Sequence, residues 1–88
     1  MILDYFEGLE SVISEFQPII NSHSTNTKVY SKNKGFIRGE IVFTNGHQLA
    51  FAEVVDLEQT PKAKYRYHLM DENGALIFRY DNAPHSPI

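Results

Sequence analysis

Residues 36–55 have the sequence FIRGEIVFTNGHQLAFAEVV, which predicts two antiparallel strands joined by a tight turn. Apolar residues alternate with polar or small ones on both sides of Asn45-Gly46, and a period of two is typical of a strand with one buried face. Asn-Gly is the strongest short hairpin signal, because a two-residue turn needs positive φ angles. The stretch therefore predicts strands at about residues 35–44 and 47–56.

A two-residue turn also fixes the register, so the residues of each face can be assigned. Thr44 is expected opposite His47, and Arg38 opposite Glu53. One face is then apolar with small residues at its middle, so that a helix can pack on it, and the other is mixed. The apolar face is expected to carry Ile37, Gly39, Ile41, Phe43, Ala50, Ala52 and Val54, and the mixed face Phe36, Arg38, Glu40, Val42, Leu49, Phe51, Glu53 and Val55.

Asn73-Gly74 predicts a second hairpin with strands at about residues 63–71 and 75–81. The same register rule places Arg66 opposite Asp81 and His68 opposite Arg79. The aromatic face is expected to join the core under a helix, and the polar face is expected to point outward. The aromatic face carries Tyr65, Tyr67, Leu69, Leu76, Phe78 and Tyr80, and the polar face Arg66, His68, Met70, Ile77, Arg79 and Asp81.

The remaining segments complete an α+β domain. One helical stripe of apolar residues predicts a helix over about residues 4–17; the stripe is Ile2, Phe6, Leu9, Ile13, Phe16 and Ile20. The polar segment 21–27 predicts a loop, followed by a short strand at about 28–32, and the proline-containing segment 82–88 an irregular tail. We expect one domain, 1–88, with the N-terminal helix packed on a four- to five-stranded antiparallel meander.

Composition narrows the class of protein. The absence of cysteine excludes disulfides, thiol catalysis and cysteine-ligated metal centres. No apolar run approaches the roughly 20 residues of a membrane span, and no basic signal segment begins the chain, so we expect a cytoplasmic protein with no membrane partner. The net charge is −3, yet residues 1–27 contain no Lys or Arg and all eight lie further along the chain. A local basic face is therefore compatible with the acidic total.

The outward face of the second hairpin is the best candidate for a site. Arg66 and Arg79 can each bind a phosphate group through two hydrogen bonds. His68 beside them can act as a general acid or base near neutral pH. Asp81 pairs with Arg66 in the expected register. The alternative is an ordinary solvated face, since opposite charges across strands keep exposed sheets soluble.

Two other sites are weaker alternatives. The aromatic side chains Tyr65, Tyr67, Phe78 and Tyr80 can stack on bases, but the helix is expected to need that face for the core. His68, Asp81 and His85 can approach one another as metal ligands, but they lack the tight spacing of a metal site. We therefore expect neither a metal nor a cofactor.

Residues 65–85, YRYHLMDENGALIFRYDNAPH, resemble the hallmark region of the TumE-type toxin family. In that region a YRYH strand leads through a turn to an FRYDNAPH segment. The resemblance implies a growth-inhibiting toxin of a type II toxin–antitoxin system, paired with a helix-turn-helix antitoxin encoded by a neighbouring gene. Family members commonly continue into a histidine-rich tail, so we expect a short member or a form without that tail.

The residues and the resemblance together give two hypotheses. The first is a metal-independent ribonuclease, or a toxin that interferes with translation, whose site consists of His68, Arg79, Arg66 and Asp81 with His85 beside them. The second is a non-enzymatic module that binds protein or nucleic acid. A homodimer is compatible with either, because a domain this small buries only about 60% of the surface of its unfolded chain.

Overall fold

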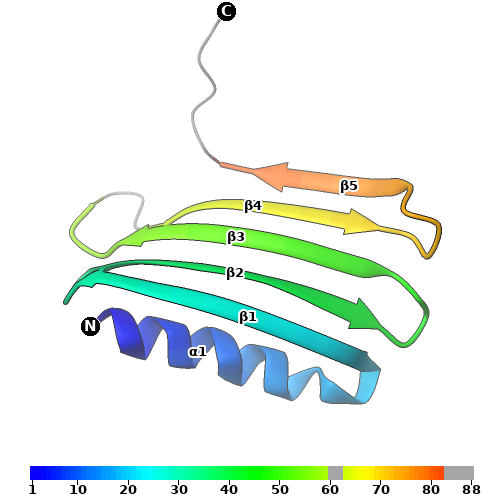
Figure 1. The fold of residues 1–88 in the computed structure, drawn as a ribbon, viewed down its shortest axis with the longest axis horizontal. Helices are drawn as coiled ribbons and strands as arrows, with labels where there is room; N and C mark the ends of the chain where they lie inside the picture. Colours follow the sequence, from blue (N-terminus) through cyan, green and yellow to red (C-terminus); the bar gives the residue numbers. More distant parts are fainter. Residues whose placement is uncertain (60–62, 83–88) are drawn as a thin grey trace, which may run out of the picture.

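The computed structural model describes residues 1–59 and 63–82 as one helix beside a five-stranded sheet (Figure 1). Helix α1 spans Ile2–Glu15 and is followed by a short 3-10 helix, η1, at Gln17–Ile19. All neighbouring strands are antiparallel and keep their chain order in the sheet: β1 (Ile20–Ser31), β2 (Lys34–Phe43), β3 (Gln48–Asp56), β4 (Ala63–Met70) and β5 (Leu76–Asp81). The predicted α+β fold, an N-terminal helix on an antiparallel meander, is confirmed.

The core lies between the helix and the first three strands. Helix α1 runs along β1 at one edge of the sheet, while β5 forms the opposite edge (Figure 1). Its apolar stripe buries Ile2, Phe6 and Ile13, against strand residues of which Ile37 is 0% and Val55 1% exposed. The predicted stripe is therefore the buried face from Ile2 to Ile13, whereas Phe16 is 52% exposed. Ile20 lies in β1, and the helix begins at Ile2 rather than at residue 4.

Strand β1 is much longer than the sequence predicts. The expected loop at residues 21–27 is wrong, because β1 runs from Ile20 to Ser31 and pairs with β2 along its length. Most of its side chains are exposed, so the segment shows no alternation of apolar and polar residues. Its backbone amides and carbonyls find partners in β2, and this pairing holds a strand that side-chain patterning does not reveal.

The first hairpin closes with a three-residue loop, not the expected two-residue turn. Phe43 N donates to the carbonyl of His47 over 2.8 Å, and Gly46 N donates to the carbonyl of Phe43 over 2.9 Å. Gly46 has a φ of +89°, the left-handed conformation that follows a type I turn in such loops. Asn45 Oδ1 accepts a hydrogen bond from His47 N and stabilises the loop.

This loop shifts the register of β2 and β3 by one residue and exchanges the two faces of β3. Arg38 lies opposite Ala52, and Ile37 lies opposite Glu53, so the predicted pairs Arg38–Glu53 and Thr44–His47 are wrong. The change matters because a shift by one residue turns each side chain of one strand to the other face. The core side of β3 thus holds Phe51, Glu53 and Val55, and the solvent side holds Ala50, Ala52 and Val54.

The second hairpin has the predicted register along most of its length. Arg66 pairs with Asp81 and His68 with Arg79, with a shift only near Met70. In the turn, Asp71 Oδ1 accepts hydrogen bonds from the backbone N–H groups of Asn73 and Ala75. The two polar pairs proposed from sequence therefore lie side by side.

The prediction that the aromatic face of this hairpin joins the core under the helix holds for Tyr67, which packs against the core, and is wrong for the residues of β5. Helix α1 packs on β1 and β2 and leaves the β4–β5 end of the sheet uncovered (Figure 1). Phe78 is 47% and Tyr80 is 56% exposed. A helix of 14 residues placed along one edge is too narrow to cover five strands, since an α-helix is about 10 Å wide and strands are about 4.8 Å apart.

Two glycines give a direct test of this packing. A Cβ at Gly39 would lie 2.6 Å from the carbonyl oxygen of Ser24 and 2.7 Å from the ring of Phe51. We expect Gly39→Ala to lower the free energy of unfolding by about 1–3 kcal/mol, because the backbone must shift. In contrast, Gly8→Ala, with open space around its Cβ, is expected to add up to about 1 kcal/mol of helix propensity. Urea unfolding measures both, and equal effects of the two changes would contradict the packing.

Candidate functional site

The face of the sheet opposite α1, here called the open face, carries two neighbouring rows of polar side chains across the five strands. Each row follows residues that are paired from strand to strand, and β3 contributes an alanine to each. The first row is Asn26, Arg38, Ala52, Arg66 and Asp81, and the second row is Ser24, Glu40, Ala50, His68 and Arg79. Within each row, the meander thus brings together residues that are up to 55 positions apart in the sequence.

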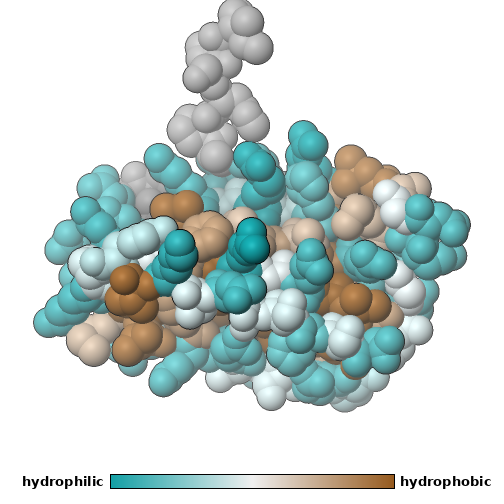
Figure 2. All heavy atoms as spheres, viewed as in Figure 1, coloured by the Kyte–Doolittle hydropathy of each residue, from teal (hydrophilic) through white to brown (hydrophobic). Residues whose placement is uncertain are grey.

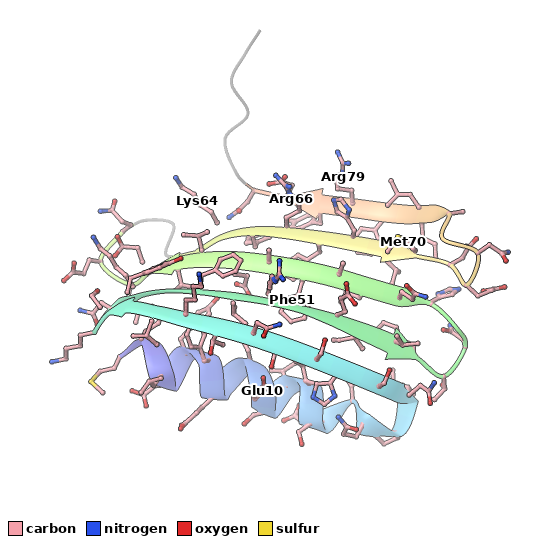
Figure 3. All side chains as sticks on the ribbon, viewed as in Figure 1. Glu10, Phe51, Lys64, Arg66, Met70 and Arg79 are labelled. Carbon is pink, nitrogen blue, oxygen red and sulfur yellow. The ribbon has the colours of Figure 1, made fainter. Side chains whose placement is uncertain are left out.

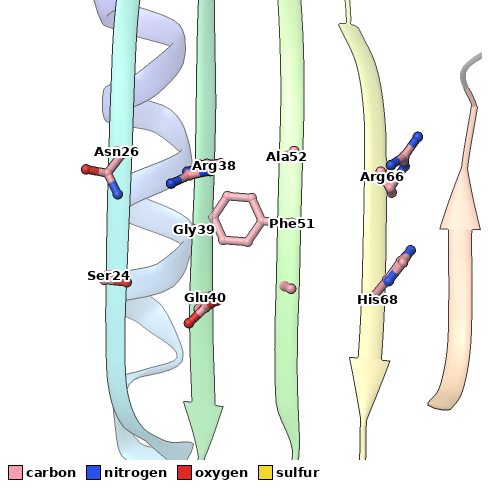
Figure 4. Close-up of a pocket in the computed structure, with 10 residues that line it drawn as sticks. Ser24, Asn26, Arg38, Gly39, Glu40, Phe51, Ala52, Arg66 and His68 are labelled. Atoms are coloured by element: carbon pink, nitrogen blue, oxygen red, sulfur yellow. The ribbon is translucent and has the colours of Figure 1, made fainter. Parts of the chain in front are cut away.

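The two alanines form the floor of a shallow trough. Ala50 and Ala52 have the shortest side chains in the rows, whereas long side chains extend from the flanking strands β2 and β4 (Figure 4). The trough encloses about 440 Å³ and opens on the side away from the helix (Figure 4). Its walls are Ser24, Asn26, Arg38, Glu40, Arg66 and His68, and Gly39 and Phe51, which belong to the helix side of the sheet, border its floor. This volume is within the range of small-molecule sites in proteins.

The open face is basic, although the chain as a whole is acidic. All three arginines of the sequence lie on it, and Lys34 there forms an ion pair with Asp56 over 3.7 Å. Apart from that pair, positive charge dominates the strand residues of this face. The positive residues are Lys28, Arg38, Lys64, Arg66 and Arg79, and the negative ones are Glu40 and Asp81. Figure 2 shows hydrophilic side chains interspersed with weakly apolar ones over the middle of the molecule, and strongly apolar groups to the left and right. Helix α1 carries the acidic residues Asp4, Glu7, Glu10 and Glu15 and no basic one.

Four of the five residues proposed from sequence come together on the open face. Arg66 Nε donates a hydrogen bond to Asp81 Oδ2 over 3.2 Å. The Asp81 side chain is 7% exposed and that of Arg66 is 62% exposed, so the carboxylate holds an arginine that still reaches solvent. Arg79 extends from the neighbouring edge strand β5 (Figure 3). The fifth residue, His85, lies outside the described residues.

His68 is half-buried between Ala50 and Arg79. Its Nε2 is enclosed and has no hydrogen-bond partner among the described residues. A buried polar atom without a partner costs about 1–3 kcal/mol, so the enclosed Nε2 of His68 is an uncommon feature of this face.

Arg38 and Glu40 complete the trough, and the sequence interpretation did not propose them as site residues. A two-residue turn at Asn45-Gly46 predicts Arg38 opposite Glu53. Including Thr44 in the loop moves the register by one and places alanines between β2 and β4. A three-residue hairpin loop that ends in glycine fits Thr44-Asn45-Gly46. That loop would have predicted the correct register and with it the trough.

The helix side of β3 and β4 holds a buried carboxylate among tyrosines. Glu53 is 3% exposed and accepts a hydrogen bond from the hydroxyl of Tyr5 over 2.7 Å. Burial, together with the charge of Glu53 and a hydrogen bond to it, raises the pKa of Tyr67 to about 12. Burial and the hydrogen bond to Glu53 also raise the pKa of Tyr5. This cluster links helix, β3 and β4, and its tyrosines hold their protons at neutral pH.

Beyond that cluster, tyrosine rings continue towards the uncovered edge. Tyr65 and Tyr80 stack with ring centroids 5.5 Å apart and planes 10° apart, and the centroid of Tyr67 lies 5.2 Å from that of Tyr65. A hydrogen bond with Tyr80, followed by burial, raises the pKa of Tyr65. The rings stack on one another, and this face is separated by the sheet from the arginines of the open face.

Within residues 1–59 and 63–82, no three His, Asp or Glu side chains are grouped so that they could hold a metal ion. The metal alternative with His68, Asp81 and His85 depends on His85, which lies outside those residues. No helix in the same ranges has the length and apolar character needed to cross a membrane.

Comparison with known proteins gives one match. The model of the family described as "Toxin TumE" matches residues 9–88, which is most of the chain and includes both hairpins. No curated protein and no solved structure matches the chain. The matched segment contains the whole open face, so the trough belongs to the part of the chain that the family model covers.

Proposed function

The chain belongs to the TumE toxin family, and from this premise we propose that it arrests growth as the toxin of a type II toxin–antitoxin pair by acting on RNA at the open face. The activity is that of a metal-independent ribonuclease that needs no cofactor. It acts in the cytoplasm, where its substrate is found. The observation that supports this proposal is the pairing of His68 with Arg79 next to Arg66 with Asp81 on a basic face.

Each of these side chains has a role in the proposed chemistry. Arg66 and Arg79 bind phosphate oxygens of the RNA backbone, because guanidinium groups match phosphate geometry and stabilise charge that develops during cleavage. Asp81 orients Arg66 through the 3.2 Å hydrogen bond. His68 transfers a proton to or from a reacting oxygen. His85 acts beside them, on the segment that continues from β5.

The antitoxin is the proposed protein partner. A helix-turn-helix protein encoded by the neighbouring gene binds the toxin and relieves the arrest. The RNA substrate is drawn to the open face by its phosphate charge, whereas the acidic helix α1 would repel it. A homodimer stays compatible with this arrangement, because β1 and β5 each pair with one strand only within the described residues.

Growth after induced expression tests this proposal. We expect the wild-type chain to arrest bacterial growth, and its neighbouring gene to restore it. His68→Ala and Arg79→Ala are each expected to abolish the arrest, because removal of a proton-transfer or charge-stabilising group costs a factor of about 10² or more in rate. Growth curves together with RNA integrity in the arrested cells provide the measurement.

His23→Ala is the matched control, since His23 is exposed on the helix side of β1, and it should remain toxic. Circular dichroism establishes that each variant is folded. Folded His68→Ala and Arg79→Ala variants that still arrest growth would contradict the proposed site. Arrest with intact RNA would direct attention to interference with translation.

A second candidate function, a non-enzymatic binding module, is favoured by the apolar exposure of β5. Leu76, Phe78 and Tyr80 are all about half exposed on this edge strand, and exposed apolar surface of this kind often contacts a partner. In this case Phe78→Ser and Tyr80→Ser would abolish the arrest, and the substitutions at His68 and Arg79 would not. The two functions therefore make opposite predictions for the two faces of β5.

A further inference from the structure

Glu40 and His68 face each other across the floor of the trough. Ala50 lies between them in the second row, just as Ala52 lies between Arg38 and Arg66 in the first. Two steps between neighbouring strands separate the Cα atoms of Glu40 and His68 by about 10 Å. Both side chains line the same trough, so they can approach a bound molecule from opposite sides above Ala50.

Of the two acidic groups that flank the trough and its β5 edge, Glu40 is the one available to act as a base. Asp81 is engaged by Arg66, whereas the exposed side chain of Glu40 makes neither a hydrogen bond nor an ion pair with any residue in the described ranges. His68 has no such partner there either, and its Nε2 is enclosed. An unpaired carboxylate and an unpaired imidazole are thus held on opposite walls of one site.

The two arginines of the adjacent row can hold the phosphate between these groups. Residues two apart in a strand are about 6.8 Å apart, so Arg38 lies one such step from Glu40, and Arg66 one step from His68. Arg38 forms no ion pair within the described residues. Guanidinium groups on both sides of Ala52 can therefore bind the non-bridging oxygens while the acid and base reach the bridging ones.

We infer that Glu40 and His68 are the general base and general acid of the proposed ribonuclease, and that its substrate is RNA with a free 2′-hydroxyl at the cut. This inference rests on the proposed function. Glu40 accepts the proton of the 2′-hydroxyl, and the 2′ oxygen forms a bond to phosphorus. The bond from phosphorus to the 5′ oxygen breaks, and that oxygen takes a proton from the imidazolium of His68.

The products of this step are a 2′,3′-cyclic phosphate and a 5′-hydroxyl end. One proton is taken up by Glu40 and one is released by His68, so exchange with water restores the starting state and no co-reactant is consumed. Arg38 and Arg66 stabilise the negative charge that accumulates on the non-bridging oxygens. DNA lacks the attacking 2′-hydroxyl and is bound without being cut.

The test uses the purified full chain with a fluorescent mixed-sequence single-stranded RNA and the DNA of the same sequence. We expect the RNA to be cut to 2′,3′-cyclic phosphate ends and the DNA to stay intact. Glu40→Gln is expected to lower the cleavage rate by about 10²–10⁴-fold, with little change in RNA affinity. In this variant, the limb of the pH–rate profile that reports the general base should be absent. Glu15→Gln, an exposed carboxylate near the end of α1, is the matched control and should cut normally.

Three results would overturn the inference. A Glu40→Gln variant that cuts RNA at the wild-type rate would show that Glu40 is not the base, while the ribonuclease proposal would stand. Products with a 5′-phosphate would show that water, not the 2′-hydroxyl, attacks phosphorus. That result would overturn the inferred mechanism, while the ribonuclease proposal would stand. A wild-type chain that binds this RNA without cutting it would refute the proposed ribonuclease itself, and the acid–base pair with it.

Discussion

The double variant Arg38→Ala/Arg66→Ala is expected to lower the affinity of the protein for single-stranded RNA by about 10²-fold or more. Each guanidinium group lines the trough beside Ala52, and a hydrogen bond to a charged group contributes about 1.5–3 kcal/mol. The dependence of binding on salt should weaken as well, because each lost phosphate contact reduces the slope of log K against log salt by about one. Fluorescence anisotropy at several salt concentrations measures both quantities.

The control removes the same charge elsewhere. Lys32→Ala/Lys34→Ala also removes two positive charges, but at the β1–β2 turn end of the sheet, where Lys34 already pairs with Asp56. We expect a much smaller loss of affinity in this variant, since only the long-range field changes. Equal losses in the two double variants would mean that RNA is attracted by net charge alone, and would contradict a built phosphate site.

Glu53→Ala is expected to lower the free energy of unfolding by about 3–5 kcal/mol. The substitution leaves a cavity in the core and removes the acceptor of the Tyr5 and Tyr67 hydroxyls, and both effects destabilise a buried site. A domain of 88 residues has a total stability of roughly 4–13 kcal/mol, so much of the population would unfold on mild heating. Thermal and urea unfolding give the value.

Two further variants separate the causes. Glu53→Gln keeps an acceptor of nearly the same shape and should destabilise less. The triple variant Tyr5→Phe/Glu53→Leu/Tyr67→Phe replaces the polar cluster with apolar groups and should unfold close to the wild type, because no buried polar atom is left without a partner. A loss below about 1 kcal/mol in Glu53→Ala would show that water replaces the carboxylate there.

Alkaline pH provides an independent readout of the same cluster. The pKa of Tyr67 rises from its usual value of 10.0 to about 12, so the native chain keeps a proton that the unfolded chain releases. The corresponding stability is complete below pH 10 and is lost as the pH rises towards 12. Tyr67→Phe should therefore flatten this decline between pH 10 and 12.

Much of the fold follows from local patterns in the sequence. The helical stripe from Ile2 to Ile13 is buried, and the second hairpin has the expected pairs Arg66–Asp81 and His68–Arg79. These features depend on neighbours in sequence or on one short turn, where periodicity and turn chemistry are strong signals. The interpretation failed where a strand lacks such a pattern, as in the polar, exposed edge strand β1.

The candidate site could be predicted only in part, for a similar reason. One hairpin holds Arg66, His68, Arg79 and Asp81, so a single correct register brings them together. Arg38 and Glu40 reach the same site only through two further strand pairings, and an error of one residue in the first loop placed them against the wrong partners. Each additional strand pairing must have the correct register before these residues are assigned to the right face.

The helix, the two hairpins and the polar pairs of the second hairpin follow from local sequence, because each depends on contacts between residues close along the chain. The three-residue loop at Gly46, the alanine floor of the trough, the burial of Glu53 and the exposure of the β5 aromatics emerge only in the folded chain. These features depend on which face each strand turns to the helix and on how far a single helix extends across five strands. Strand orientation and helix coverage both depend on backbone pairing and packing between different segments. The periodicity of a single segment therefore does not reveal them.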